Sequence, residues 1–328
     1  MFEIANWDHA TENEYDYLVG MAIQNIKFGS GRITRVFRRG ETAYFNAIFD
    51  GSPSMREFLI ELLGGWNNYF ADATEEMCRR RLDWPKRKKA ASEAKHKAEI
   101  RAVLKERQIS CLLHFTRIEN LASILREGII PRSDLGDREF IANDGQRADG
   151  FPEASCLSIG FPNYKMLYKY QQQRIGSNWA VLQVSPDILA EMTCSYYQTN
   201  AAAFESRSKA EINIAALQGA GALLNMFAEP LNGLRNLLKL PSDYSTDPQA
   251  EVLAFGRIDP KHIKGVALLR PDLEARQMLR DCAPLIQVKS PSPYFYQRHD
   301  HAHWVRRRWG DVCMGTVRAH NDLSVECV

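Results

Sequence analysis

The chain has 328 residues, 45% of them hydrophobic, and a formal net charge of +2 at pH 7. This length favours about two domains and is ample for a large core. No apolar run approaches the roughly 18 residues that a membrane-spanning helix needs, so we expect no membrane segment. A net charge this close to zero does not by itself indicate whether the protein binds nucleic acid, but the basic residues are clustered along the chain.

The N-terminus and the cysteines favour a cytoplasmic protein without a metal site. Residues 1–10 include Glu3 and Asp8 and lack the apolar stretch of a signal peptide. The seven cysteines are scattered, odd in number and form no C-x-x-C pair. Neither a disulfide framework nor a zinc site is therefore expected.

Residues 1–75 have the pattern of a small separate unit. β-rich runs at 19–37 and 43–51 are broken at glycines, as in a small antiparallel barrel. The Phe28-Gly-Ser-Gly-Arg-Ile33 stretch resembles the SH3/Tudor-like modules of UvrD-type helicases and CarD-type transcription factors. Such a module implies docking of a protein or a nucleic acid; the alternative is a barrel that only packs on its neighbour.

Residues 76–107 are dense in Lys and Arg, notably at Arg79–Arg81 and Lys86–Lys89. After Pro85, the Ala, Glu and Lys content favours a helix. This basic segment is either a solvated helical linker or a helix that contacts phosphates. Salt-sensitive binding would distinguish the two.

The apolar run that ends at Leu113 predicts a buried strand, and the helix that follows is expected to stop at Gly128. His114 and Thr116 would then lie where the strand ends and the helix is about to begin. A histidine at such a position is typical of a hydrogen-bonded core residue as well as of a catalytic group.

Apolar positions between Phe204 and Leu240 predict two helices that cover the sheet, separated near Gly219-Ala-Gly221 and Pro230. Next, Asp247 and Pro248 indicate a turn before the apolar strand 252–255. Glu251 lies at the mouth of that strand. A carboxylate there is costly to desolvate, so Glu251 is either at an exposed sheet end or held there to react.

Residues 291–328 form an aromatic and basic tail. Aromatic rings that stack on bases, combined with arginines that contact phosphates, are typical of single-strand binders; a partly packed, solvated tail is the alternative. His299, His301 and His303 alternate, but no fourth ligand follows at a recognisable spacing, so no metal is expected.

The run from His114 to Ile129 resembles the opening of the DarT family, toxin ADP-ribosyltransferases that use NAD to modify bases in single-stranded DNA. Further similar stretches follow in the family's order, at 143–150, 156–166, 179–184, 199–202 and 249–253. The resemblance covers residues 109–270 and leaves out residues 1–107.

The resemblance implies a site drawn from separate segments of the chain. It assigns catalysis to Glu251 and Arg147, and NAD binding to His114, Thr116, Asn120, Ser158 and Asn163. It also implies phosphate contacts from Arg207, Lys209 and Arg235, in the segment that borders the DNA site. No G-x-G-x-x-G follows a strand, so NAD would not lie on a Rossmann fold.

The chemistry fits these residue types. Cleavage between nicotinamide and ribose leaves an oxocarbenium-like centre, which the carboxylate of Glu251 would stabilise. The same carboxylate can act as general base for the attacking nitrogen if it reaches that proton. Arg147 would orient the NAD phosphates or withdraw electron density from the acceptor base; a surface pair with Asp144 or Asp149 is the alternative.

We therefore expect an α+β protein in four parts. An SH3-like barrel (1–75) and a basic helical linker (76–107) precede an ADP-ribosyltransferase core of two packed β-sheets with flanking helices (108–290), and a basic aromatic extension (291–328) ends the chain. The expected function is transfer of ADP-ribose from NAD to a nucleobase of single-stranded DNA, as a toxin of a toxin–antitoxin or phage-defence system with a neutralising antitoxin. The alternatives are RNA bases as acceptors or an inactive nucleic-acid-binding adaptor, and the modified base, thymidine or guanosine, stays open.

Overall fold

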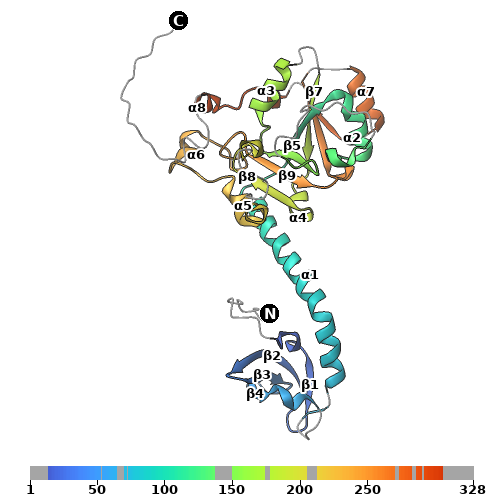
Figure 1. Cartoon of the computed structure of the whole chain (residues 1–328), viewed down its shortest axis with the longest axis vertical. Coiled ribbons are helices and arrows are strands. Elements are labelled where there is room, and N and C mark those ends of the chain that lie inside the picture. Colours follow the sequence, from blue (N-terminus) through green and yellow to red (C-terminus); the bar gives the residue numbers. More distant parts are fainter. Residues whose placement is uncertain are drawn as a thin grey trace. The chain divides into compact units, whose positions relative to one another are not determined.

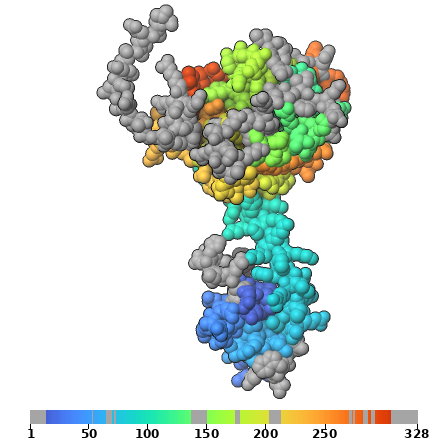
Figure 2. All heavy atoms as spheres, in the orientation of Figure 1, coloured from blue at the N-terminus to red at the C-terminus, as the bar shows by residue number. Residues whose placement is uncertain are grey.

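The structure is a computed structural model that describes residues 14–305, except 53, 65–69, 72, 137–149, 174–177, 205–212, 270–272, 283–285 and 290–291. The chain divides into two compact units, Met1–Ala94 and Lys95–Val328 (Figure 1). Figure 2 draws the same units with all heavy atoms, the first from blue to cyan and the second from cyan to red.

The first unit is built on a four-stranded antiparallel sheet. The strands β1 (Ala22–Asn25), β2 (Gly29–Arg39), β3 (Thr42–Phe49) and β4 (Arg56–Leu59) lie in sequence order. Among the described strands this sheet is open, with β1 and β4 at its two ends, so the prediction of a closed SH3-like barrel is not confirmed. An isolated antiparallel bridge joins Asn25 of β1 to Phe70.

The hydrophobic core of this unit lies on one face of the sheet. Phe45, Ala47 and Phe49 alternate inward along β3 and are fully or almost fully buried. Between β2 and β3 the chain turns in two residues, and Gly40 has φ +61°, the positive value that short hairpin turns favour. The core is completed by Met77 and Trp84 of the helix that follows.

The predicted basic helix is present as α1 (Thr74–Glu106), but it begins well before Pro85, which lies inside it. Lys86–Lys89 are all exposed, as expected of a solvated helix. Near the C-terminal end, Ile100, Val103 and Leu104 are buried in the core of the second unit. Their spacing of three and four residues places them on one face of the helix.

The second unit contains seven strands in the order β11-β10-β7-β5-β6-β9-β8. Their bounds are β5 (Leu112–Arg117), β6 (Ala154–Ile159), β7 (Trp179–Val184), β8 (Cys194–Tyr197), β9 (Glu251–Phe255), β10 (Ile263–Leu268) and β11 (Gln287–Lys289). The neighbours pair antiparallel, apart from β10 and β11. The predicted α+β class is confirmed. The core was expected to contain two packed sheets, but its seven strands follow one another in a single hydrogen-bonded order.

Short helices flank this sheet. They are α2 (Leu121–Glu127), α3 (Tyr164–Gln173), α4 (Ile188–Glu191), α5 (Gly219–Asn225), α6 (Leu234–Leu237), α7 (Leu273–Cys282) and α8 (His301–Trp304). Gly128 ends α2 with φ +88°, as expected. Gly219, by contrast, begins α5 instead of separating two helices. The sequence patterns did not reveal α7 or β11.

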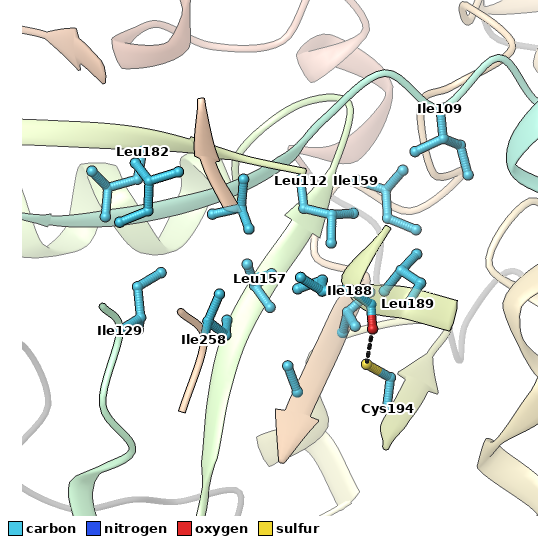
Figure 3. Close-up of a cluster of buried hydrophobic side chains, with 14 of the residues drawn as sticks. Ile109, Leu112, Ile129, Leu157, Ile159, Leu182, Ile188, Leu189, Cys194 and Ile258 are labelled. Carbon is cyan, nitrogen blue, oxygen red and sulfur yellow. Dashed lines mark hydrogen bonds between the residues drawn. The ribbon is translucent and has the colours of Figure 1, made fainter. Parts of the chain in front are cut away.

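The main core packs side chains from one face of the sheet against α2, α4, α5 and α7. Figure 3 shows part of it, with Leu112, Leu157 and Leu182 from three strands beside Ile188 and Leu189 of α4. Cys194 also lies in this core, and burial raises the pKa of its thiol to about 12. That thiol therefore stays protonated at neutral pH. Within the part of the chain that the structure describes, no helix is both long and apolar enough to cross a membrane.

Candidate active site

A split between two neighbouring strands defines the candidate site. β5 pairs with β6 only at Leu112–Ile159 and Leu113–Ser158. Beyond Leu113, β5 continues beside β7, while β6 continues beside β9. Because the two strands part there, their polar groups at this point need other partners.

His114 is the first residue of β5 beyond the split. Its side chain turns to β6, and Nδ1 lies 2.9 Å from the carbonyl oxygen of Cys156. This contact fixes the ring beside the parting strands. His114 lies within β5, whose last residue is Arg117, so the strand continues a little past the predicted end at Leu113. A ring nitrogen held in this way sets which tautomer the other nitrogen presents.

Glu251 is the first residue of β9 and is only 5% exposed. Its Oε2 accepts a hydrogen bond of 2.9 Å from the backbone N–H of Ala201. Ala201 follows the turn at Thr199-Asn200, and the Oδ1 of Asn200 in turn accepts from the N–H of Ala202. The carboxylate is therefore held inside the protein and not at an exposed sheet end.

The sheet register places Ser158 between the two strands that carry His114 and Glu251. Ser158 is opposite Leu113 on one side, and on the other side Leu157 is opposite Val252, which follows Glu251. With about 4.8 Å between neighbouring strands, Glu251 lies about 10 Å from Leu113, the residue that precedes His114, across this row. Side chains alternate along a strand, so Ser158 and Glu251 share one face and His114 begins on the other.

Asn163 joins this group from the start of α3. Its backbone N–H donates to the Oγ of Ser158 at 3.2 Å, and its Oδ1 caps the helix by accepting from the N–H of Met166 at 3.2 Å. Asn163 is 1% exposed, and its Nδ2 has no hydrogen-bond partner among the described residues. A buried donor of this kind is costly to leave unpaired, which fits a ligand acceptor at this position.

Thr116 and Asn120 lie farther along, at the end of β5 and in the turn after it. Thr116 is 3% exposed, and its Oγ1 accepts from the Nδ2 of Asn120 at 3.3 Å. The two side chains thus bind each other. Arg147, Arg207 and Lys209 fall outside the described residues.

Arg235 is not a phosphate contact, so this prediction is wrong. The side chain is only 8% exposed and its guanidinium donates inward. Its acceptors are the carbonyl oxygens of Pro241, Ser242 and Tyr244 and the Oγ1 of Thr246, at 2.8 to 3.3 Å. A guanidinium has five N–H donors in a fixed fork, which suits the gathering of several carbonyl groups.

The aromatic and basic tail is partly packed where the structure describes it, and two of its residues are too buried for the base and phosphate contacts that were one of the two alternatives. Arg298 and Trp304 are each 1% exposed. Arg298 donates to the carbonyl oxygens of Ser245 and Thr246 at 2.8 and 2.9 Å and forms an ion pair with Asp300. The Nε1 of Trp304 donates to the same carboxylate at 2.7 Å.

Arg235 and Arg298 together hold the segment 241–247, which leads into β9. This segment also packs on the turn after β6, because a Cβ atom at Gly160 would lie 2.5 Å from the carbonyl oxygen of Asp243. Asp247 ends the segment, and burial raises the pKa of its carboxyl group. The position of Glu251 thus depends on two arginines that the sequence patterns did not connect with it. The one signal in the sequence is the Arg298-His-Asp300 spacing, which places a carboxylate two residues from a guanidinium.

Metal chemistry finds no support in the described part of the chain, where no group of three or more His, Cys, Asp or Glu side chains could hold an ion. The chemistry available at the site is that of a buried carboxylate, a fixed imidazole and buried amide and hydroxyl groups.

Comparison with known proteins identifies the family. The model of the family described as "ssDNA thymidine ADP-ribosyltransferase, DarT" matches residues 113–279, which is just over half of the chain. The chain belongs to the DarT family. This confirms the resemblance expected for the core. The matched residues include all seven predicted site residues.

Solved structures of DarT proteins are also similar to the chain, at low identity. The DarTG of Thermosipho africanus in complex with ADP-ribose has a TM-score of 0.40 and 17% identity, covering 58% of this chain and 52% of that chain. The DarT of Thermus sp. 2.9 in complex with ADP-ribosylated ssDNA has a TM-score of 0.38 and 13% identity, covering 58% and 97%. The same DarT in complex with NAD+ has a TM-score of 0.36 and 14% identity, covering 57% and 98%. The chain thus spans about half the length of the first of these structures. A comparison of the chain with curated proteins found no match.

Proposed function

We propose that this protein transfers ADP-ribose from NAD to thymidine in single-stranded DNA. The observation that carries the proposal is the family match over residues 113–279, whose segment includes Glu251 buried and fixed at the start of β9. Thymidine is taken from the description of the family. RNA bases, and guanosine in DNA, are the acceptors that an experiment must separate from it.

Glu251 acts at the ribose. When the bond between nicotinamide and ribose breaks, nicotinamide leaves with the bonding electron pair and positive charge develops on the sugar. A carboxylate held near this charge lowers the barrier, because it is oriented before the reaction and shielded from water. The same carboxylate then accepts the proton that the base nitrogen loses as it bonds to the sugar carbon.

The remaining site residues hold NAD. His114 orients the ribose next to the nicotinamide, while Ser158 and the free Nδ2 of Asn163 supply hydrogen bonds close to Glu251. Thr116 and Asn120 anchor the dinucleotide at the end of β5. Arg147 supplies the charge that orients the phosphates or polarises the acceptor base, as the resemblance implies.

The biological role follows from the chemistry. An enzyme that modifies bases of DNA damages its own cell, so we propose a cytoplasmic toxin that an antitoxin neutralises, with phage defence as the setting. The first unit of the chain lies outside the family match and is proposed to dock another macromolecule.

An oligonucleotide panel tests the function. The protein is incubated with NAD and with single-stranded DNA and RNA oligonucleotides that differ in one base, and the products are weighed by mass spectrometry. Gain of one ADP-ribose only on thymidine-containing DNA supports the proposal. Modification of RNA, of guanosine or of protein in a lysate would redirect it, and unmodified oligonucleotides with retained binding would favour the inactive adaptor.

A further inference from the structure

The outer face of the N-terminal sheet is the strongest feature that the catalytic site does not use. Side chains that alternate away from the core on β2 and β3 include Arg35, Phe37 and Arg39 on one strand and Tyr44 and Ile48 on the next. The solvent face of an antiparallel sheet is usually polar. Here it carries two aromatic rings, and Ile48 is 44% exposed.

The two rings form a flat stack bordered by guanidinium groups. Phe37 and Tyr44 are opposite each other across the strands, with centroids 5.7 Å apart and planes 15° apart. Arg39 lies over both rings, at 5.1 and 5.3 Å, and Arg35 lies 5.5 Å from the centroid of Phe37. Neither ring belongs to the hydrophobic core of the unit, and both are only half-buried.

Charge on this face is positive. The charged residues of the four strands that alternate to it are Arg32, Arg35, Arg39 and Glu57. Glu57 pairs with Arg39 through two hydrogen bonds of 2.8 and 2.9 Å, which holds that guanidinium flat against the rings. Among the described residues of this face, Arg32 and Arg35 have no acidic partner, and Nη1 of Arg32 donates to the carbonyl oxygen of Gly20 at 2.6 Å.

We propose that this outer face, made by Arg32, Arg35, Phe37, Arg39 and Tyr44, binds single-stranded DNA. A partner must offer flat apolar groups for the rings and regularly spaced negative charge for the arginines, and a single strand offers both. Bases stack on exposed aromatic rings with little dependence on sequence, while arginines bind the phosphates. A duplex fits poorly, because its bases are already stacked and paired.

The inference rests on the proposed function only in taking DNA, not RNA, as the strand. The face would give the enzyme a second hold on its substrate, outside the reaction site. Duplex DNA, RNA of the same sequence and a protein partner are the competing occupants.

Binding is measured on the full chain without NAD, so a failure of catalysis does not affect the result. A fluorescent single strand of about 12 nucleotides, within the range of single-strand site sizes, is titrated at several salt concentrations. The double variant Phe37→Leu/Tyr44→Leu keeps apolar bulk but removes the rings, and we expect each lost ring to weaken binding about fivefold or more. Arg35→Gln should lower the slope of log affinity against log salt by about 0.7.

Arg38→Gln is the matched control. It removes one partly exposed arginine from the same strand, β2, but its side chain alternates to the other face and pairs with Glu14, so affinity and slope should stay unchanged. Circular dichroism and thermal unfolding verify that the variants fold. Unchanged affinity for the single strand in the folded double variant overturns the proposal. Equal binding of duplex DNA also overturns it, as does a double variant that loses only the binding of a protein partner. Stronger binding of RNA than of DNA overturns the choice of strand.

Discussion

Arg298 and Asp300 form an ion pair that is closed to solvent on both sides. The Nε and Nη2 atoms of Arg298 lie 2.6 and 2.7 Å from the two carboxylate oxygens, and the side chains are 1% and 0% exposed. The same guanidinium reaches the carbonyl oxygens of Ser245 and Thr246, more than fifty residues earlier in the chain. This pair therefore connects the C-terminal segment to the turn that precedes Glu251.

Replacing Arg298 should loosen that turn. We expect Arg298→Ala to lower the free energy of unfolding by about 3–5 kcal/mol, because it leaves the carboxylate of Asp300 buried and unpaired. Arg298→Lys keeps the charge but not the planar fork, so the fold should persist with reduced kcat and a nearly unchanged KM for NAD. Urea unfolding and single-turnover transfer measure the two effects. Tyr296→Ala, at a neighbouring position that is 65% exposed, serves as control, and equal loss there would contradict this role.

Acid should weaken the same contact. Burial alone would raise the pKa of Asp300, but hydrogen bonds from Arg298 and Trp304 outweigh it and hold that pKa below the ordinary 3.8. The contribution to stability is therefore complete above that ordinary value and is lost as the pH falls through the lower pKa. Urea unfolding between about pH 5 and pH 2 should show this loss. Trp304→Phe removes one of the hydrogen bonds that lower this pKa, so we expect a smaller loss that is complete at a higher pH in that variant.

Two glycines provide a test of the packing around the site. Gly160 and Gly136 both have positive φ, +72° and +56°, but only at Gly160 would a Cβ atom meet another segment, the carbonyl oxygen of Asp243. Gly136→Ala should lower the free energy of unfolding by only about 1–2 kcal/mol, because the alanine must adopt a left-handed backbone conformation. Gly160→Ala should cost more and also reduce transfer, because it displaces the segment that leads to Glu251. Similar melting temperatures and activities for the two variants would show that this contact is unimportant.

Two variants of Asn163 can separate its structural role in capping α3 from a role in binding NAD. Asn163→Ser keeps an oxygen that can cap α3 but loses the buried Nδ2 donor without burying a charge, so thermal stability should change little. If Nδ2 binds NAD, the KM for NAD should rise about tenfold or more with kcat retained. Asn163→Ala, which also loses the cap, should in addition lower stability by about 1 kcal/mol. An unchanged KM in the Ser variant would remove Asn163 from the NAD site.

Glu251 should act in the transition state more than in binding. We expect Glu251→Ala to abolish transfer while NAD affinity stays within about tenfold, since the lost interaction forms as the sugar becomes positively charged. Isothermal titration with NAD and mass spectrometry of the oligonucleotide report the two quantities separately. Glu191→Gln, a partly exposed glutamate that lies near His262, is the control. Transfer by the Glu251 variant at the wild-type rate would refute the assignment.

Local chemistry in the sequence determined the elements that carry the site. The strand Trp179–Val184, the stop at Gly128 and the position of Glu251 at the mouth of β9 were all visible, because alternation, glycine and turn residues act over a few neighbours. Only the tertiary structure decided that the N-terminal sheet stays open, that β5 and β6 part after Leu113, and that Arg235 and Arg298 turn inward. Each of these depends on partners far away in the chain: an edge strand needs another strand to close it, and an arginine can be buried only where distant carbonyl and carboxylate oxygens meet it. A basic residue therefore looks the same in the sequence whether it will contact phosphate or hold a catalytic segment in place.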